Sequence, residues 1–370
     1  MTASRGQLPE ELAGRLLTYT NYKWLDVAIS ATGRNSGLVA AGAGCRPGLR
    51  RIRSAKDTGP LVYDERRWAA ELASPSSPLG LPSGDALFEI TLDQWVDGVV
   101  ADGVRAVLTP SKFVASADWP TLRALVEAAN EVTSPRAITL VATDAAMLDP
   151  ERLGTFVDVV SRSVKPLAFV FATKRRPLGS AGRVAGLRTL LAAVPGSLLL
   201  ATEVLAALDG LTHGAAAAAI GLTGGLRRPA RPDDVTGGGF SNGALPGLFL
   251  RELCEHRSPM TYADWYANSP SPRCDRCGGR ALDSFAGTDQ DRRAILRHNV
   301  HTWLAMWDEL HPLRREEQQQ ALAEELRTAF TRHARLRLGN VRLEVDPLLR
   351  QLVELDDPEQ RSATRAGSWR

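Results

Sequence analysis

Cysteine is scarce in this chain, with four residues among 370. Three of the four nevertheless lie within one stretch, at Cys254, Cys274 and Cys277. In an intracellular protein, a Cys-x-x-Cys pair such as Cys274 and Cys277 is more typical of a metal or redox site than of a structural disulfide. The few cysteines therefore direct attention to the segment between residues 254 and 277.

Long hydrophobic runs are absent as well. No stretch of 18 or more apolar residues occurs, which excludes a membrane-spanning helix. The first 17 residues, MTASRGQLPEELAGRLL, carry acidic and basic side chains and lack the apolar core of a signal peptide. We therefore expect a cytoplasmic protein without a membrane partner.

The chain also lacks a strong excess of one charge. Its net charge of +3 is too small to argue for a nucleic-acid partner. Basic residues do concentrate at 46–56, 174–176 and 224–232. These stretches could neutralise phosphates, or they could be solvated arginine-rich surface. No G-x-G-x-x-G sequence follows a predicted strand, which argues against dinucleotide binding.

Between residues 60 and 225, short apolar runs alternate with amphipathic segments. The apolar runs predict strands at 59–64, 104–111, 137–144, 166–173, 196–202 and 215–225. The segments between them predict helices at 92–103, 119–132, 149–164, 182–194 and 204–214. Nearly continuous apolar strands that alternate with helices indicate a parallel sheet covered on both faces. The prediction is an α/β fold, a (β/α)₈ barrel of the TIM type, with a doubly wound sheet as the alternative.

The composition changes beyond residue 225. Residues 226–273 are rich in glycine, proline and arginine, and amphipathic helices are predicted at 291–310 and 315–338. The tail at 356–370 is predicted to be disordered. We expect four parts: an N-terminal segment packing on the barrel (1–58), the main part of the barrel (59–250), a zinc-binding subdomain with its helix (251–310), and C-terminal helices with the tail (311–370).

Two histidines, His298 and His301, follow the Cys-x-x-Cys pair and are spaced by one helical turn. Zn²⁺ prefers four tetrahedral ligands from thiolate and imidazole groups, and a Cys-x-x-Cys turn supplies two of them. His298 and His301 could complete the site, or His298 could do so together with Cys254. The competing interpretation is a pair of reduced surface cysteines without a metal.

The stretch CDRCGGRALDSF and the later RHNVHTW resemble the zinc element of the tRNA-guanine transglycosylase superfamily. In that family a C-x-C-x-x-C cluster is followed, after a helical stretch, by a His-Asn dipeptide. Cys274, Cys277 and His298 match the last two cysteines and the histidine, whereas Pro272 stands where the first cysteine would be. The resemblance implies a Zn²⁺ cofactor, with Cys254 replacing the missing thiol. It also implies a (β/α)₈ barrel with the zinc subdomain near its end.

The resemblance extends in order over residues 60–300 and implies a catalytic acid. The stretch GPLVYDERRWA resembles the strand that carries the family's Asp-Ser-Gly-Gly motif, and Asp64 stands at the base-contacting acid. Glu-Arg-Arg replaces Ser-Gly-Gly, and the strand resembling the one with the covalent nucleophile reads AAAIG, without a carboxylate. A single aspartate could still orient water or stabilise an oxocarbenium-like centre while a base departs.

The resulting hypothesis is an enzyme that cleaves or exchanges a base at an N-glycosidic bond of DNA or RNA. A DNA glycosylase that removes modified bases in antiviral defence is one form of it. Asp64 would be the catalytic residue, and Arg227 and Arg228 would hold phosphate. Tyr63 or Trp68 would stack on a base flipped out of its helix. The alternative for Asp64 is a strand-end acid paired with a neighbouring arginine.

Two other functions remain open from the sequence. One is a non-catalytic nucleic-acid-binding scaffold derived from the same family, which the missing nucleophile favours. The other is an unrelated barrel enzyme that binds a phosphorylated small molecule at GLTGGLRR, where glycine amides and arginines could hold the phosphate. A homodimer or a protein partner is the additional expectation.

Overall fold

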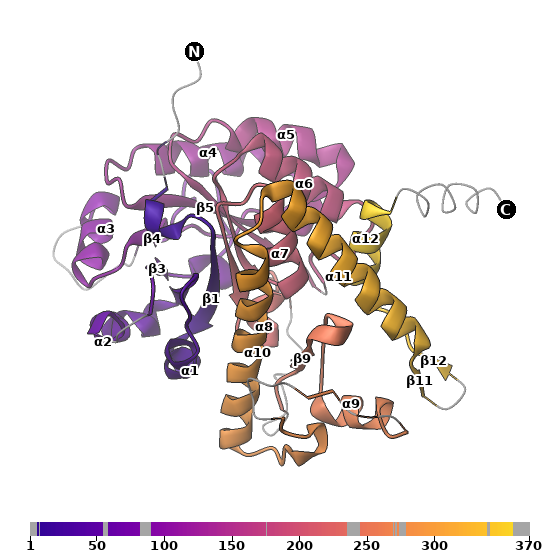
Figure 1. Ribbon diagram of the computed structural model, residues 1–370. Coiled ribbons are helices and arrows are strands. Elements are labelled where there is room, and N and C mark those ends of the chain that lie inside the picture. Colours follow the sequence, from indigo (N-terminus) through magenta and orange to yellow (C-terminus); the bar gives the residue numbers. More distant parts are fainter. Residues whose placement is uncertain are drawn as a thin grey trace.

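Eight parallel strands form a closed barrel in sequence order, from β1 to β8 (Figure 1). The computed structural model describes residues 6, 8–54, 58–81, 90–174, 176–234, 245–268, 270, 272–273, 279–338 and 341–357. The barrel strands are β1 (Arg15–Asn21), β2 (Ser36–Ala41), β3 (Leu61–Asp64), β4 (Ala106–Leu108), β5 (Ala137–Asp144), β6 (Leu167–Ala172), β7 (Leu198–Thr202) and β8 (Ala217–Gly221). The predicted (β/α)₈ barrel is confirmed.

Helices follow the strands and surround the barrel. They are α1 (Leu25–Ser30), α2 (Leu49–Ser54), α3 (Leu92–Ala101), α4 (Trp119–Asn130), α5 (Pro150–Val160), α6 (Arg183–Ala193), α7 (Val204–Thr212) and α8 (Gly224–Arg227). Local signals mark several helix starts. The Thr91 hydroxyl accepts from the backbone N–H of Gln94 ahead of α3, and the Asp118 carboxylate accepts from that of Thr121 in α4.

The first two barrel strands lie within residues 1–58, which the sequence analysis assigned to a segment packing on the barrel. That assignment is corrected here, because β1 closes the barrel by pairing with both β2 and β8. The sequence signal is weak for a physical reason. Thr18 and Thr20 are buried in β1, and β2 is rich in small residues, so neither strand is a continuous run of large apolar side chains.

Side chains alternate along each strand between the barrel interior and the surrounding helices. Leu12, on the 3₁₀ helix η1 (Glu10–Leu12) that precedes β1, belongs to the interior cluster. Trp68 and Phe113, which follow β3 and β4, belong to the same cluster. Aromatic rings from loops at the carboxyl end of the barrel therefore pack into its interior.

Gly221, the last residue of β8, allows the single turn of α8 to lie directly against the strand end. A Cβ atom at this position would come within 2.1 Å of the carbonyl carbon of Leu226. A side chain at residue 221 is therefore incompatible with the close packing of α8 against the end of β8.

The helices of the C-terminal third cover the part of the barrel between α7 and α1, where α8 has a single turn. The helix α10 (Asp289–Leu310) packs beside α1 and β1, and α11 (Arg315–Arg335) packs beside α7 (Figure 1). The remaining elements are β9 (Leu248–Leu250), β10 (Glu255–Arg257), α9 (Pro259–Trp265), β11 (Arg337–Leu338), β12 (Val341–Arg342) and α12 (Pro347–Asp356). The β9–β10 hairpin, α9 and the start of α10 share a small apolar core.

None of the helices in the described part of the chain is both long enough and apolar enough to cross a membrane.

Candidate active site at the carboxyl end of the barrel

Asp64 is the last residue of β3, and its carboxylate points into the barrel because Val62, two residues earlier, faces the interior. The side chain is completely buried. Its Oδ2 accepts hydrogen bonds from the Tyr19 hydroxyl at 2.5 Å and from the Trp68 indole N–H at 3.1 Å. Its Oδ1 accepts from the backbone N–H of Arg66 at 2.7 Å. Three donors from the protein therefore surround this carboxyl group.

The pKa of Asp64 is raised, and burial is the main cause. The hydrogen bonds from Tyr19, Trp68 and Arg66, together with the charge of Arg66, act in the opposite direction without cancelling the effect of burial. A carboxyl group that keeps its proton to a higher pH than usual is suited to general acid catalysis. Burial and the neighbouring charge of Asp64 also raise the pKa of Tyr19, which keeps the hydroxyl protonated as a donor.

The backbone next to Asp64 is strained. Arg66 adopts φ 62° and ψ 31°, a left-handed conformation that costs a residue with a side chain about 1–2 kcal/mol. Its guanidinium lies 5.4 Å from the centre of the Trp68 ring, and its Nε is buried without a hydrogen-bond partner among the described residues. Strain of this kind concentrates at functional sites.

The two predicted stacking residues lie on opposite faces of the barrel wall. Trp68 is 1% exposed, belongs to the interior cluster and contacts Asp64. Tyr63 points away from the interior, packs against Trp95 with 6.3 Å between ring centres, and donates to Glu65 at 2.6 Å. Tyr63 therefore cannot stack on a base in the barrel mouth, and Trp68 is the remaining candidate.

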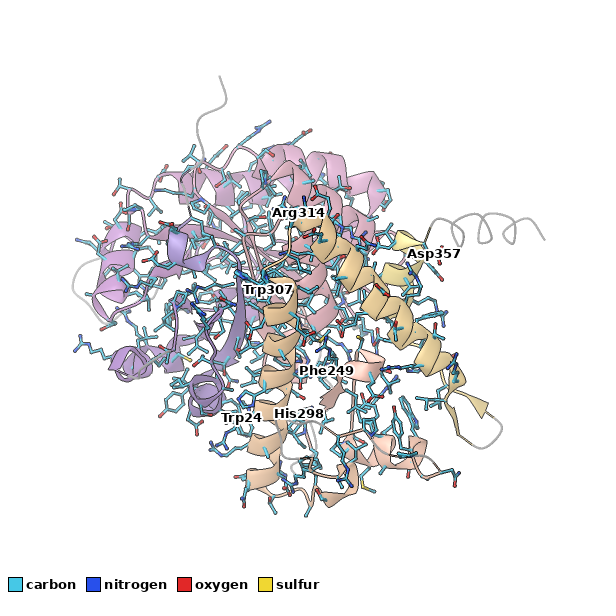
Figure 2. The ribbon with its side chains drawn as sticks, in the orientation of Figure 1. Trp24, Phe249, His298, Trp307, Arg314 and Asp357 are labelled. Atoms are coloured by element: carbon cyan, nitrogen blue, oxygen red, sulfur yellow. The ribbon has the colours of Figure 1, made fainter. Side chains whose placement is uncertain are left out.

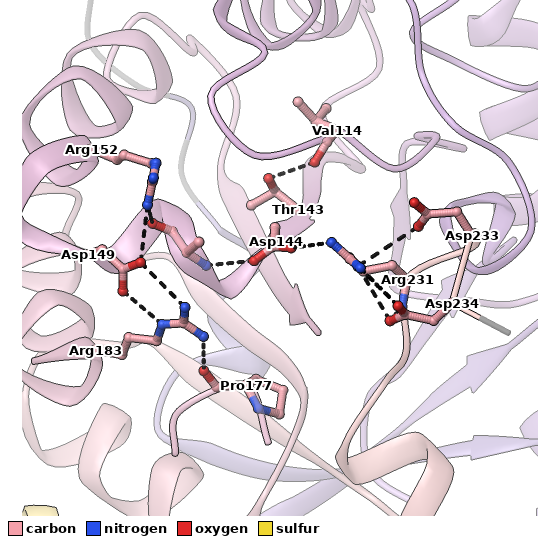
Figure 3. A network of polar contacts seen from close by, with 11 residues as sticks. Val114, Thr143, Asp144, Asp149, Arg152, Pro177, Arg183, Arg231, Asp233 and Asp234 are labelled. Carbon is pink, nitrogen blue, oxygen red and sulfur yellow. Dashed lines mark hydrogen bonds and ion pairs between the residues drawn. The ribbon is translucent and has the colours of Figure 1, made fainter. Parts of the chain in front are cut away.

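A second carboxylate that sequence reasoning missed lies at the end of β5. Asp144 ends an eight-residue buried strand, and its Oδ1 accepts from the backbone N–H of Ala146 at 2.8 Å. Its Oδ2 accepts from Arg231 at 3.3 Å, and Arg231 is itself held by Asp234 at 2.9 Å (Figure 3). The signal was present in the sequence, because Asp144 closes an apolar strand just as Asp64 does.

A third carboxylate, Glu203, follows β7 directly. The ladder between β7 and β8 is irregular between Leu199 and Thr202, and Ala201 adopts φ 51° there. The Glu203 Oε1 accepts from Arg228 at 2.5 Å. Burial raises the pKa of Glu203, although the charge of Arg228 opposes this. Glu203 was missed because a nucleophile was expected on the following strand, β8, which reads AAAIG and carries no carboxylate.

The structure assigns Arg227 and Arg228 internal partners. Arg227 is 6% exposed, and its Nη1 donates to the carbonyls of Gly221 and Leu222 at 3.1 and 3.0 Å. Burial and the charge of Arg228 lower the pKa of Arg227, which nevertheless stays protonated at neutral pH. Arg228 pairs with Glu203 and lies 3.8 Å from Asp346. The predicted phosphate-binding role does not fit Arg227, since its guanidinium holds the turn after β8.

The predicted zinc ligands are placed in part. Cys274 and Cys277 lie outside the described residues. His298, on α10, contacts β9 (Figure 2), where its Nε2 donates to the Phe249 carbonyl at 2.9 Å. His298 and His301 line a cavity of about 320 Å³ together with Pro272, which lies two residues before Cys274. Arg280, the described residue three positions after Cys277, lines the same cavity.

Cys254 lies in a different environment. Its side chain is 3% exposed within the main apolar core, and its Sγ donates to the Arg251 carbonyl at 3.3 Å. Burial raises the pKa of this thiol, with a further contribution from the charge of Glu325. A metal ligand must be a thiolate, so these surroundings favour His301 over Cys254 as the fourth ligand.

The described residues contain no group of three or more histidine, cysteine or acidic side chains that could hold a metal ion. Because that part of the chain excludes Cys274 and Cys277, the finding concerns sites elsewhere in the molecule.

No family model matches the chain, and no curated protein matches it. The resemblance to tRNA-guanine transglycosylases therefore rests on the quoted motifs. Many unrelated activities share the (β/α)₈ barrel, so function must be argued from the site.

Proposed function

We propose that this chain cleaves or exchanges a base at an N-glycosidic bond of a nucleic acid, with Asp64 as the catalytic acid. The observation that carries the proposal is the buried carboxyl group of Asp64 at the carboxyl end of β3. Active sites of (β/α)₈ enzymes are built at this end of the barrel. A raised pKa in such a position is typical of a group with a chemical role.

Asp64 would act by giving its proton to a basic nitrogen or oxygen of the departing base while the bond between the base and the sugar carbon breaks and its electron pair leaves with the base. The carboxylate that remains would stabilise the positive charge on the sugar carbon. Water then attacks the sugar carbon in hydrolysis, or a second base attacks it in exchange, and the proton that the attacking molecule loses returns to the Asp64 carboxylate. Tyr19, whose hydroxyl lies 2.5 Å from Oδ2, would hold the carboxyl group in place through both steps.

The nucleic-acid part of the proposal rests on the family resemblance. Arg228 and Arg231, which the sequence analysis counted among phosphate-binding stretches, are paired with carboxylates inside the chain. Phosphate contacts would therefore come from other exposed cations around the mouth.

We test the proposal by incubating the purified protein with defined DNA and RNA and scoring released bases and abasic sites by mass spectrometry. The expected result is one released base whose amount grows with time. Asp158→Asn, which changes an exposed carboxylate on the outer face of α5, is the matched control and should retain the wild-type rate. No released base from any substrate would reject the activity.

We also propose one structural zinc ion, held by Cys274, Cys277, His298 and His301. The residues fit the group, because a zinc-bound histidine commonly donates its other ring N–H to a carbonyl, as His298 does to Phe249. Burial lowers the pKa of His298, which favours the neutral form that binds metal. The zinc would tie the Cys-x-x-Cys pair to α10 and takes no part in the proposed reaction.

Elemental analysis tests the zinc proposal, and about one zinc per chain is expected. His301→Asn should lower the bound zinc, whereas Cys254→Ser should keep it. The reverse pattern would restore Cys254 as the ligand, and a metal-free wild-type protein would remove the site.

A non-catalytic nucleic-acid-binding scaffold is the second candidate. The observation that favours it is the complete burial of Asp64, whose two oxygens are both occupied by donors from the protein. Filter binding to the same DNA and RNA separates the two functions. Salt-sensitive binding without any released base would support the scaffold.

A further inference from the structure

No substrate group can reach Asp64 in the present arrangement. The side chain is 0% exposed, and Tyr19, Arg66 and Trp68 all donate to it. A base that is to receive a proton from Asp64 must therefore displace one of these three donors.

Two of the three donors are fixed by the fold. Tyr19 lies within β1, where it is paired with Val39 of β2 on one side and Gly221 of β8 on the other. The second donor is the backbone N–H of Arg66, which no side-chain rotation can remove. Trp68 differs from Arg66 because it donates through its side chain, and from Tyr19 because it lies on the three-residue 3₁₀ helix η4 (Arg67–Ala69) and not within a barrel strand.

The neighbours of Trp68 are held on the outer side of η4, whereas its indole ring lies on the inner side, in the barrel-interior cluster. Arg67, the residue before it, is held on the outside by Glu71 at 3.1 Å and Glu65 at 3.9 Å. Glu65 is in turn fixed by Tyr63. The left-handed Arg66 directly precedes η4. The strained backbone therefore lies where a movement of Trp68 away from Asp64 would begin.

We propose that Trp68 is a gate over Asp64, and that this structure is its closed position. The inference rests on the proposed catalytic role of Asp64. In the closed position the indole N–H and the Tyr19 hydroxyl both donate to Oδ2 of Asp64, so removal of the indole leaves this oxygen with one donor fewer. In the open position Asp64 is accessible, and the displaced indole ring lies at the rim of the barrel, where it can stack on the incoming base. One residue then excludes solvent before binding and supplies stacking surface after it.

Hydrogen exchange of the indole N–H groups tests the gate without any substrate. Trp307 is the matched internal control, because it is 2% exposed and its indole N–H donates to the Gly14 carbonyl at 3.0 Å. If Trp68 opens locally, its indole proton should exchange about 100-fold faster than that of Trp307. Low concentrations of urea should leave the Trp68 rate unchanged, since a local opening exposes little additional surface.

The two indole resonances are assigned with Trp68→Phe and Trp307→Phe. If Trp68→Phe does not fold, the Trp68 resonance is identified instead by its shift in Asp64→Asn, which alters its hydrogen-bond partner. Equal exchange rates for Trp68 and Trp307, with the same dependence on urea, would show that Trp68 opens only on global unfolding and would overturn the gate.

This outcome is independent of the proposed activity. Fast local exchange in a protein that releases no base would leave the gate standing and reject the proposed reaction. Base release by a protein whose Trp68 proton exchanges as slowly as that of Trp307 would do the opposite.

Discussion

Two fully buried aspartates of this protein have opposite surroundings. Asp64, in the barrel mouth, is held by neutral donors, and burial raises its pKa. Asp209, on α7, is 1% exposed and is bridged by Arg188 at 2.5 Å. Burial alone would raise the pKa of Asp209 too, but hydrogen bonds from His213 and Arg188 lower it overall.

The difference separates a structural carboxylate from one suited to chemistry. Arg188 also binds Asp356 at 2.5 Å, so the ionised Asp209 links α7 through α6 to the C-terminal helix α12. The bridge through Arg188 requires the negative charge of Asp209. Because Asp209 is buried between helices, a substrate does not reach its carboxylate in this structure. Asp64 forms no ion pair with another described residue, and its raised pKa keeps a proton available for donation during a reaction.

The largest expected effect is that of Asp64→Asn on base release. The substitution keeps the shape of the side chain but removes the proton donor and the negative charge. We expect a loss of roughly 100-fold or more in the rate of base release, measured by mass spectrometry on the substrate that the wild type cleaves. Circular dichroism should show that the variant is folded. A folded variant that cleaves at the wild-type rate would assign the chemistry to another residue.

The second effect falls on stability instead of activity. Asp209→Asn removes the charge that Arg188 and His213 face in a buried position, so that Asp356 is the one described carboxylate still paired with Arg188. Breaking a buried ion pair from one side costs about 3–5 kcal/mol. We expect a loss of that size in the free energy of unfolding in urea, with unchanged base release per folded molecule. A variant as stable as the wild type would show that the Asp209–Arg188 ion pair orients the two side chains without stabilising the fold.

The pH dependence of stability should differ in sign for the two aspartates. The folded-state pKa of Asp64 lies above its unfolded value of about 3.9, so the folded protein binds the extra proton and loses stability as pH rises from about 4 through the raised pKa. The pKa of Asp209 is lowered, so its contribution is complete above about pH 4 and is lost as pH falls through the lowered value.

Urea unfolding between about pH 3 and pH 8 measures both contributions. Asp64→Asn should remove the decline on the alkaline side of about pH 4, and Asp209→Asn should remove the decline on the acidic side. Parallel stability curves for the wild type and Asp64→Asn would mean that Asp64 titrates normally in the folded state.

The sequence was sufficient for much of the barrel and for the position of Asp64. The strands from β3 to β8 are apolar runs that alternate with helices, and Asp64 ends the first of them. The contact between Asp64 and Tyr19 could not be predicted in the same way. It joins residues 45 positions apart and exists only because β1 closes the barrel, and β1 carries buried threonines that weaken its apolar pattern.

The partners of the arginines could not be predicted from the sequence either. The sequence shows basic stretches but not their partners, which come from distant parts of the chain. Arg176 pairs with Asp346, which lies 170 residues later, and Arg188 pairs with Asp356, which lies 168 residues later. A local excess of positive charge in the sequence is therefore neutralised in the folded protein, and the expected phosphate contacts at Arg228 and Arg231 are replaced by ion pairs.

The smallest expected effect, and the one that most sharpens the contrast with Asp209, is that of Tyr19→Phe. The substitution removes a hydrogen bond that lowers the pKa of Asp64, so this pKa should rise further. If Asp64 acts as a general acid, the alkaline limb of the pH profile of kcat/KM moves to higher pH. If Asp64 acts only as a carboxylate, the acidic limb moves to higher pH instead.

Tyr63→Phe is the matched control for Tyr19→Phe. Tyr63 precedes Asp64 on β3, but it lies on the outer face of the barrel wall and donates to Glu65. Both variants should lose about 1 kcal/mol of stability, the usual contribution of one hydrogen bond, so only the pH profile separates them. Equal profiles for the two variants would reduce Tyr19 to a packing residue.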